Sequence, residues 1–103
     1  MNSLPNGFYK GSVGFKTSWE GKKFNAENSS GINLFDGQEK YPFKTYEEKD
    51  VLKIDYNLPE NPFWVRLILD EIVEISKDKY LGTIKLRLIP GFPVTIGHFR
   101  LEK

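Results

Sequence analysis

The clearest pattern in the chain is an alternation of apolar and polar positions in its C-terminal third. It runs strictly through 83–88 and returns over 92–102, and Pro90-Gly91 separates the two stretches. A period of two is typical of strands that bury one face. The run at 70–75, followed by a turn at 76–79, adds another strand. We therefore predict a three-stranded antiparallel meander in this part of the chain.

Turn residues recur every 8 to 12 residues or so along the rest of the chain and delimit shorter runs. These runs predict strands at 7–15, 23–26, 31–35, 41–46 and 51–56. Asp36-Gly37 predicts a type I′ hairpin turn, which needs positive φ at both central positions. In the last run, Leu52, Ile54 and Tyr56 fall on one face, and the charged Lys53 and Asp55 fall on the other.

One segment departs from the strand pattern. Asn61-Pro62 fits the start of a helix, because Asn is a preferred N-cap and Pro is tolerated at the first helical position. Apolar residues lie on nearly every side of 63–69, so this short helix would be mostly buried, as a plug in a barrel. The alternative is that the β-branched and aromatic residues of the segment continue the next strand.

These elements define a fold class. About eight strands are enough to close a barrel, which removes exposed sheet edges. We predict one mainly-β domain over residues 1–103, an antiparallel up-and-down barrel or strongly curved sheet with one short helix. Fifteen per cent of the residues are aromatic, which suits such an interior better than a helical bundle.

Charge and composition narrow the classes of partner. The net charge is only +1. Nucleic-acid binding and a polybasic membrane anchor both require clustered basic residues, so this balance of charge argues against them. The chain has no cysteine, no apolar stretch near the roughly 20 residues of a bilayer span, and no signal-peptide pattern over 1–7. We expect a cytoplasmic protein without a cofactor, a nucleic-acid partner or a membrane partner.

Two short motifs resemble the calycin superfamily of lipocalin-like barrels. Gly7-Phe8-Tyr9-Lys10-Gly11 is similar to the G-x-W motif that opens those barrels, with Tyr9 in place of Trp, and Arg100 matches an Arg near their last strand. The resemblance implies a barrel with a pocket, closed by a cation–π contact between Tyr9 and Arg100. The segment 51–103 also resembles a family of uncharacterised bacterial small-barrel proteins. Neither resemblance implies a chemistry.

Aromatic side chains could form the walls of a pocket, with a few polar groups as anchors. Arg87, Arg100 or Lys53 could hold a ligand carboxylate by charge-assisted hydrogen bonds. The candidate ligand-binding residues are Trp19, Phe43, Tyr56, Phe63, Trp64, Arg87, His98 and Arg100. The rival expectation is that an eight-stranded barrel is only just wide enough to be filled by its own side chains.

Evidence for catalysis in the sequence is thin, and we assign no catalytic residue. His98 is the single histidine, so sites built on two histidines are excluded. It could act as a general base beside Asp55 or Asp70 only if it faced the interior. A shift of one residue in the register of the last strand would exchange His98 and Arg100 for Phe99 and Leu101 on its inward face. We favour Phe99 and Leu101 in the core.

Three functions follow, in this order. The first is binding of a small apolar or amphipathic ligand inside the barrel. The second is a filled-core structural or interaction protein that acts through a surface patch or as a homodimer. The third is a small enzyme that uses His98 with a carboxylate.

Overall fold

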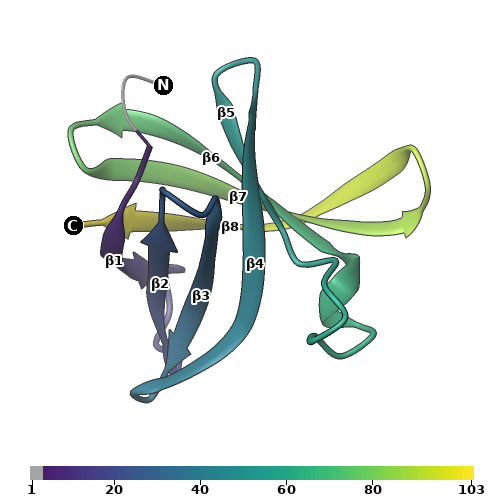
Figure 1. Ribbon diagram of the computed structural model, residues 1–103, viewed down its shortest axis with the longest axis horizontal. Coiled ribbons are helices and arrows are strands. Elements are labelled where there is room, and N and C mark those ends of the chain that lie inside the picture. The colour runs from purple at the N-terminus through teal and green to yellow at the C-terminus, as the bar shows by residue number, and fades with distance from the viewer. Residues whose placement is uncertain (1–3) are drawn as a thin grey trace.

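The computed structural model describes residues 4–103, so the first three residues of the N-terminal segment discussed above lie outside it. Eight strands follow one another around a closed antiparallel barrel, and β8 returns to pair with β1 (Figure 1). The strands are β1 (Gly7–Ser12), β2 (Trp19–Asn25), β3 (Ser30–Phe35), β4 (Gln38–Glu48), β5 (Val51–Asp55), β6 (Ile68–Ser76), β7 (Lys79–Ile89) and β8 (Phe92–Glu102). The predicted antiparallel barrel is confirmed. No helix in residues 4–103 is long and apolar enough to cross a membrane.

The β3–β4 hairpin turns where the sequence predicts it. Asp36 and Gly37 have φ values of 49° and 77°, so both central positions have the positive φ that a type I′ turn needs. β2 begins at Trp19, four residues before the predicted start. A register shift between Trp19 and Gly21 interrupts the alternation there, which hides the first part of this strand from a period-two search.

The predicted helix at 61–69 is wrong. In the described residues the segment forms only turns and one 3-10 turn, η1 (Val65–Leu67), and β6 begins at Ile68. Asn61 does not cap a helix, because its side-chain amide donates to two backbone carbonyls elsewhere, at 2.8 and 2.9 Å. Phe63 and Trp64 are 77% and 58% exposed, so the segment does not plug the barrel.

The core is built from alternate residues of the strands. The predicted inward face of β5 is confirmed, since Leu52, Ile54 and Tyr56 are all buried. On β8 the favoured parity is also confirmed, since Phe99 and Leu101 are buried. Aromatic rings fill most of the interior in edge-to-face contacts with centroids 5.4–5.8 Å apart.

β7 and β8 extend beyond the barrel as a hairpin, on the right of Figure 1. β1 pairs with β8 only at residues 100–102, so the earlier part of β8 leaves the barrel wall. A bulge at Ile96 shifts the alternation by one residue, because Ile84 opposes Gly97 but Lys85 opposes Thr95. The alternation that the sequence shows over 92–102 is therefore interrupted at Ile96. The hairpin exposes apolar side chains of Leu88, Ile89, Phe92, Val94 and Ile96.

Candidate functional site

An apolar cavity of about 260 Å³ opens at the end of the barrel that carries the β1–β2 loop. Its walls are apolar apart from Thr17, and its polar floor consists of Lys22 and Asp70. Below this floor the barrel is packed with buried side chains, among them Phe24, Ile54 and Tyr80. Among residues 4–103, the interior is therefore open at this end and filled below the floor.

Lys22 and Asp70 form an ion pair across the interior of the barrel. Lys22 lies on β2 and Asp70 on β6, and the Nζ and Oδ2 atoms are 3.0 Å apart. The two side chains are 3% and 5% exposed. Moving two charges out of water is costly, so such a pair needs further hydrogen bonds to be tolerated.

Those hydrogen bonds come from Asn33 on β3 and Tyr56 at the end of β5. The Lys22 ammonium donates to Asn33 Oδ1 at 2.9 Å and to the hydroxyl oxygen of Tyr56. With Asp70 as the third acceptor, all three donors of the ammonium are used. The Tyr56 hydroxyl in turn donates to Asp70 Oδ2 at 3.3 Å.

Aromatic rings enclose the ammonium of Lys22. Its Nζ atom lies 5.1–5.5 Å from the ring centroids of Trp19, Phe43, Tyr56 and Phe99. These distances are within the range of cation–π attraction, which strengthens when the partners are desolvated. The rings thus compensate part of the hydration that Lys22 has lost.

Burial shifts the titration of all three ionisable groups. It lowers the pKa of the Lys22 ammonium and raises the pKa of Asp70, and their mutual attraction offsets only part of each shift. Burial, together with the negative charge of Asp70, raises the pKa of Tyr56 well above its ordinary value.

One oxygen of Asp70 is left over. Oδ2 receives hydrogen bonds from Lys22 and Tyr56, but the buried Oδ1 has no hydrogen-bond partner among the described residues. A buried acceptor without a donor is rare in folded proteins and calls for an explanation. No cluster of three His, Cys, Asp or Glu side chains that could hold a metal ion occurs within residues 4–103.

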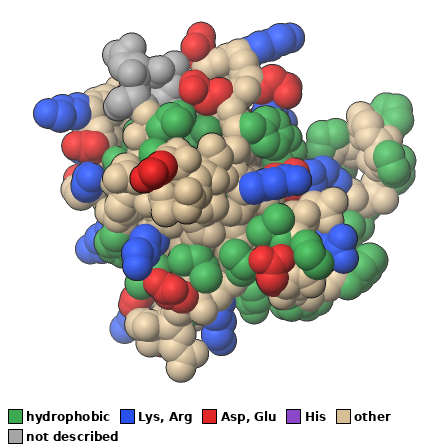
Figure 2. All heavy atoms as spheres, viewed as in Figure 1, with side chains coloured by type: hydrophobic (Ala, Val, Ile, Leu, Met, Phe, Trp, Pro, Cys, Tyr) green, Lys and Arg blue, Asp and Glu red, His purple; other side chains and the backbone are tan. Residues whose placement is uncertain are grey.

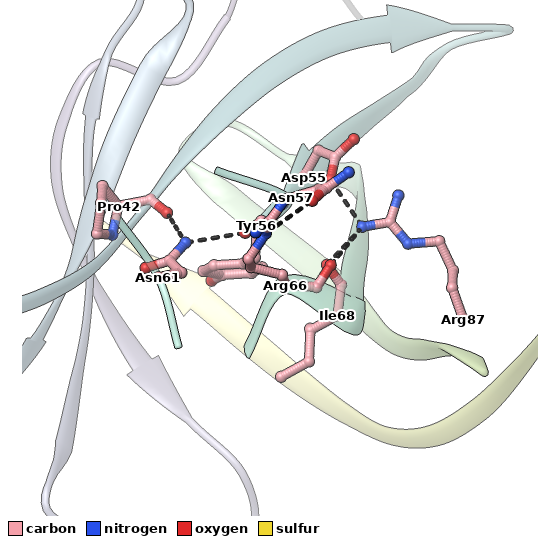
Figure 3. A network of polar contacts seen from close by, with 8 residues as sticks. All are labelled: Pro42, Asp55, Tyr56, Asn57, Asn61, Arg66, Ile68 and Arg87. Carbon is pink, nitrogen blue, oxygen red and sulfur yellow. Dashed lines mark hydrogen bonds and ion pairs between the residues drawn. The ribbon is translucent and has the colours of Figure 1, made fainter. Parts of the chain in front are cut away.

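The long β5–β6 connection is held in place by the network in Figure 3, which fixes Tyr56. The side-chain amide of Asn61 donates to the carbonyls of Pro42 and Tyr56. On the other side, Arg87 donates to Asp55 Oδ1 at 2.7 Å and to a carbonyl at the start of β6 at 3.1 Å. The two groups of contacts tie the connection to β4 and β7.

The structure brings together three of the eight predicted site residues. Trp19 lines the cavity and donates from Nε1 to Asn33 Oδ1 at 3.0 Å. Phe43 and Tyr56 lie deeper, beside the Lys22 ammonium. These three aromatic residues surround the polar floor from β2, β4 and the end of β5.

The other five lie outside the barrel interior. Phe63 and Trp64 are exposed, and the Trp64 ring makes an edge-to-face contact with Tyr41. Arg87 is partly buried and bonded to the buried Asp55, so it is not available at the cavity floor. His98 and Arg100 are exposed on the outer face of β8.

Two contacts expected of these outer residues are absent from the described structure. The cation over the Tyr9 ring is Lys103, at 5.4 Å, and not Arg100. His98 is exposed, whereas Asp70 is buried inside the barrel and Asp55 lies on β5, three strands away. The geometry therefore assembles no dyad of His98 with either carboxylate.

Sequence reasoning missed Lys22 and Asn33. Asn33 stands between Ile32 and Leu34 in a predicted strand. Lys22 lies one residue before the strand predicted at 23–26, between Gly21 and Lys23, so no apolar pattern surrounds it. On β6, Asp70 likewise stands between Ile68 and Ile72 at a spacing of two, so it is a polar residue on an otherwise apolar face. For Asn33 and Asp70, a polar residue on the inward parity of a strand was the available indication.

No family model, curated protein or solved structure matches this sequence significantly. The architecture, a closed antiparallel barrel of eight strands in chain order, is consistent with a calycin-like small barrel. The function has to be argued from the cavity and its floor.

Proposed function

We propose that the protein binds a small apolar or amphipathic molecule in the open end of the barrel. The observation that carries this proposal is an apolar cavity that ends on a buried ion pair. Ligand sites are mostly apolar concavities with a few polar groups that fix orientation, and this cavity has that composition.

The size of the cavity limits the ligand. Its volume of about 260 Å³ lies just below the roughly 300–1,000 Å³ of typical ligand sites. The packed core beneath Lys22 leaves no room for a long chain to penetrate further. The ligand is therefore a compact molecule that sits between Trp19, Ile84 and Phe99.

Larger depressions elsewhere on the molecule support the proposal less well. One of about 800 Å³ is lined partly by the exposed side chains of Lys23 and Glu39, and another of about 860 Å³ by His98 and Arg100. Both have exposed charged side chains in their linings. Neither combines apolar walls with a buried polar floor.

The test combines native mass spectrometry with a thermal-shift screen of compact apolar molecules. A bound molecule should raise the unfolding midpoint with its concentration, because it stabilises only the folded state. Ile84→Trp should fill the cavity and abolish the shift. Leu81→Trp, an exposed position on the same strand, is the matched control and should keep it.

If no compound shifts the midpoint and no molecule copurifies, ligand binding is excluded. A shift that Ile84→Trp retains would place the ligand elsewhere on the molecule.

The β7–β8 hairpin favours a second candidate function, self-association. Residues 88–97 contain no charged side chain, and five exposed apolar residues gather there, on the right of Figure 2. Pro93 and the bulge at Ile96 interrupt the strand edge, so a partner has to match side chains rather than extend the sheet. A second hairpin of the same kind does so across a two-fold axis.

Light scattering over a range of concentrations tests this candidate. The native chain should form a dimer, and Phe92→Lys combined with Ile96→Lys should make it monomeric. Val73→Lys, at a half-exposed position on β6, is the control and should leave the dimer intact. A native chain that is monomeric at all concentrations excludes the dimer.

A further inference from the structure

We infer that the ligand of this cavity carries a neutral hydrogen-bond donor, such as an alcohol, a phenol or a ring N–H, which it donates to Asp70 Oδ1. The inference rests on the proposed binding function and narrows its ligand class. It follows from which hydrogen-bonding groups of the cavity floor are already used and which one is not.

Lys22 has no donor left for a ligand. Its three N–H groups are directed to Asn33, Tyr56 and Asp70. A ligand carboxylate could bond to Lys22 only by displacing one of these buried acceptors. The lysine therefore orients the floor of the cavity and does not act as an anion anchor.

Asp70 has one acceptor left. Its Oδ2 is bonded twice, while Oδ1 is buried and receives no hydrogen bond from the described residues. A ligand donor that reaches Oδ1 replaces the hydration that this oxygen lost on folding. The side chain that carries Oδ1 also lines the cavity. Oδ1 itself is covered by its neighbours, so a ligand donor reaches it only when the carboxylate turns toward the cavity.

The charges at the floor favour a neutral group. Lys22 and Asp70 compensate each other, so the pair as a whole offers no net charge to a ligand. A carboxylate would face the like charge of Asp70, and an ammonium would lie close to the ammonium of Lys22. In apolar surroundings an uncompensated charge carries a large desolvation penalty.

The walls favour a compact ring. Phe35 and Trp19 lie on one side of the cavity, and Phe99 packs edge-to-face on Trp19 with centroids 5.6 Å apart. Flat apolar faces match flat ligands, so a phenol, an indole or a cyclic alcohol fits this space better than a flexible chain.

Four probes of nearly equal shape test the inference by isothermal titration of the full chain. They are 4-methylphenol, p-xylene, 4-methylbenzoate and 4-methylaniline in its protonated form at low pH. We expect 4-methylphenol to bind about tenfold or more tightly than p-xylene, in line with a hydrogen bond to a charged acceptor. The two charged probes should bind more weakly than p-xylene.

Asp70→Asn provides the variant arm, with Asp36→Asn on the exposed β3–β4 turn as the matched control. The preference for 4-methylphenol over p-xylene should fall to about threefold or less in Asp70→Asn and persist in Asp36→Asn. Should Asp70→Asn not fold, the probe series on the native chain decides by itself.

The outcomes separate the inference from the function on which it rests. Equal or tighter binding of p-xylene, or tightest binding of the carboxylate, overturns the donor inference while the cavity remains a binding site. If none of the four probes binds, the inference fails, and the broader screen with Ile84→Trp then decides whether the binding function fails with it.

Discussion

At the scale of single residues, the unusual feature is an ion pair inside an otherwise aromatic core. The Lys22 ammonium is coordinated by three oxygens and surrounded by four rings, so nearly every interaction that it loses with water is replaced. Replacing such a pair by apolar residues is often neutral for stability, whereas removing one partner is not. This asymmetry makes the pair testable.

Lys22→Met should destabilise the fold by about 3–5 kcal/mol, because it leaves the Asp70 charge buried without its partner. The double variant Lys22→Met, Asp70→Leu should recover much of that loss. Urea unfolding of the four proteins in the double-mutant cycle measures the coupling. A loss below about 1 kcal/mol in Lys22→Met would mean that the pair is not buried as described.

Asp55 predicts a pH dependence. Burial pushes its pKa up, but hydrogen bonds from Arg87 and from the Asn57 amide, with the charge of Arg87, hold it below the ordinary value. A carboxylate whose pKa is depressed in the folded state adds stability above its unfolded pKa of about 3.9 and loses it as the pH falls through the folded pKa.

The free energy of unfolding of Asp55→Asn should therefore lie below that of the native chain at pH 6, and the gap should narrow below about pH 4. Urea titrations from pH 6 to pH 2.5 measure both curves. A gap that stays constant over this range would contradict the role given to the Asp55–Arg87 pair.

At the scale of elements, close contacts between strands depend on glycines that face bulky rings. A Cβ atom at Gly82 would lie 2.2 Å from the Phe99 ring, which itself packs against Trp19. At Gly97 on β8, a Cβ atom would find its nearest neighbour, Ile84, at 3.5 Å. A side chain at Gly82 would therefore clash with the core, whereas a methyl group at Gly97 would be in ordinary van der Waals contact.

Gly82→Ala should destabilise the barrel by about 1–3 kcal/mol through overpacking. Phe99→Leu in the same chain should restore part of the loss, because it removes the ring that the new methyl group meets. Gly97→Ala is the matched control on the neighbouring strand and should cost much less. Equal losses in the two alanine variants would rule out the steric explanation.

The β5–β6 connection shows why a local pattern can mislead about an element. Asn61-Pro62 is a good helix start by itself, and one turn does form, with the Val65 and Arg66 amides bonded to the Pro62 carbonyl. The Asn61 side chain, however, bonds to carbonyls of β4 and of Tyr56, and the chain enters β6 three residues after η1 begins. Tertiary partners outweigh the capping propensity here.

At the scale of the whole molecule, apolar surface is concentrated at the cavity end. Phe15, Phe63 and Phe92 are 72–77% exposed, and all three belong to loops or strand ends at that end of the barrel. At the opposite end, the turns at 26–29, 49–50 and 77–78 consist almost wholly of polar residues. Both proposed functions belong to the apolar end.

Local stability should follow the same division. Amides of 88–94 should exchange with solvent orders of magnitude faster than those of Leu52, Ile54 and Ile72, because the hairpin tip has few buried contacts while the barrel strands surround the core. Hydrogen exchange on the dilute native chain measures this. Strong protection of 88–94 at low concentration would contradict the view that the tip of the β7–β8 hairpin has few stabilising contacts within one molecule.

The sequence by itself determined the strands whose alternation is regular and the turns whose residues require positive φ. β5 was predictable with its apolar face, and β6 and the barrel part of β8 were predictable as strands, because a period of two is a local property. Asp36-Gly37 was predictable because few residues accept its backbone conformation.

Only the tertiary structure decided the site. Lys22 and Asp70 meet because the closed ring places β2 opposite β6, and no local pattern encodes which strands face each other across a barrel. The bulges after Trp19 and at Ile96 shift which side chains point inward, since one extra residue reverses the parity of a strand. Hydrogen bonds between residues far apart in sequence, such as the one from Asn61 to the Pro42 carbonyl, decide whether a segment such as 61–69 forms a helix or a turn.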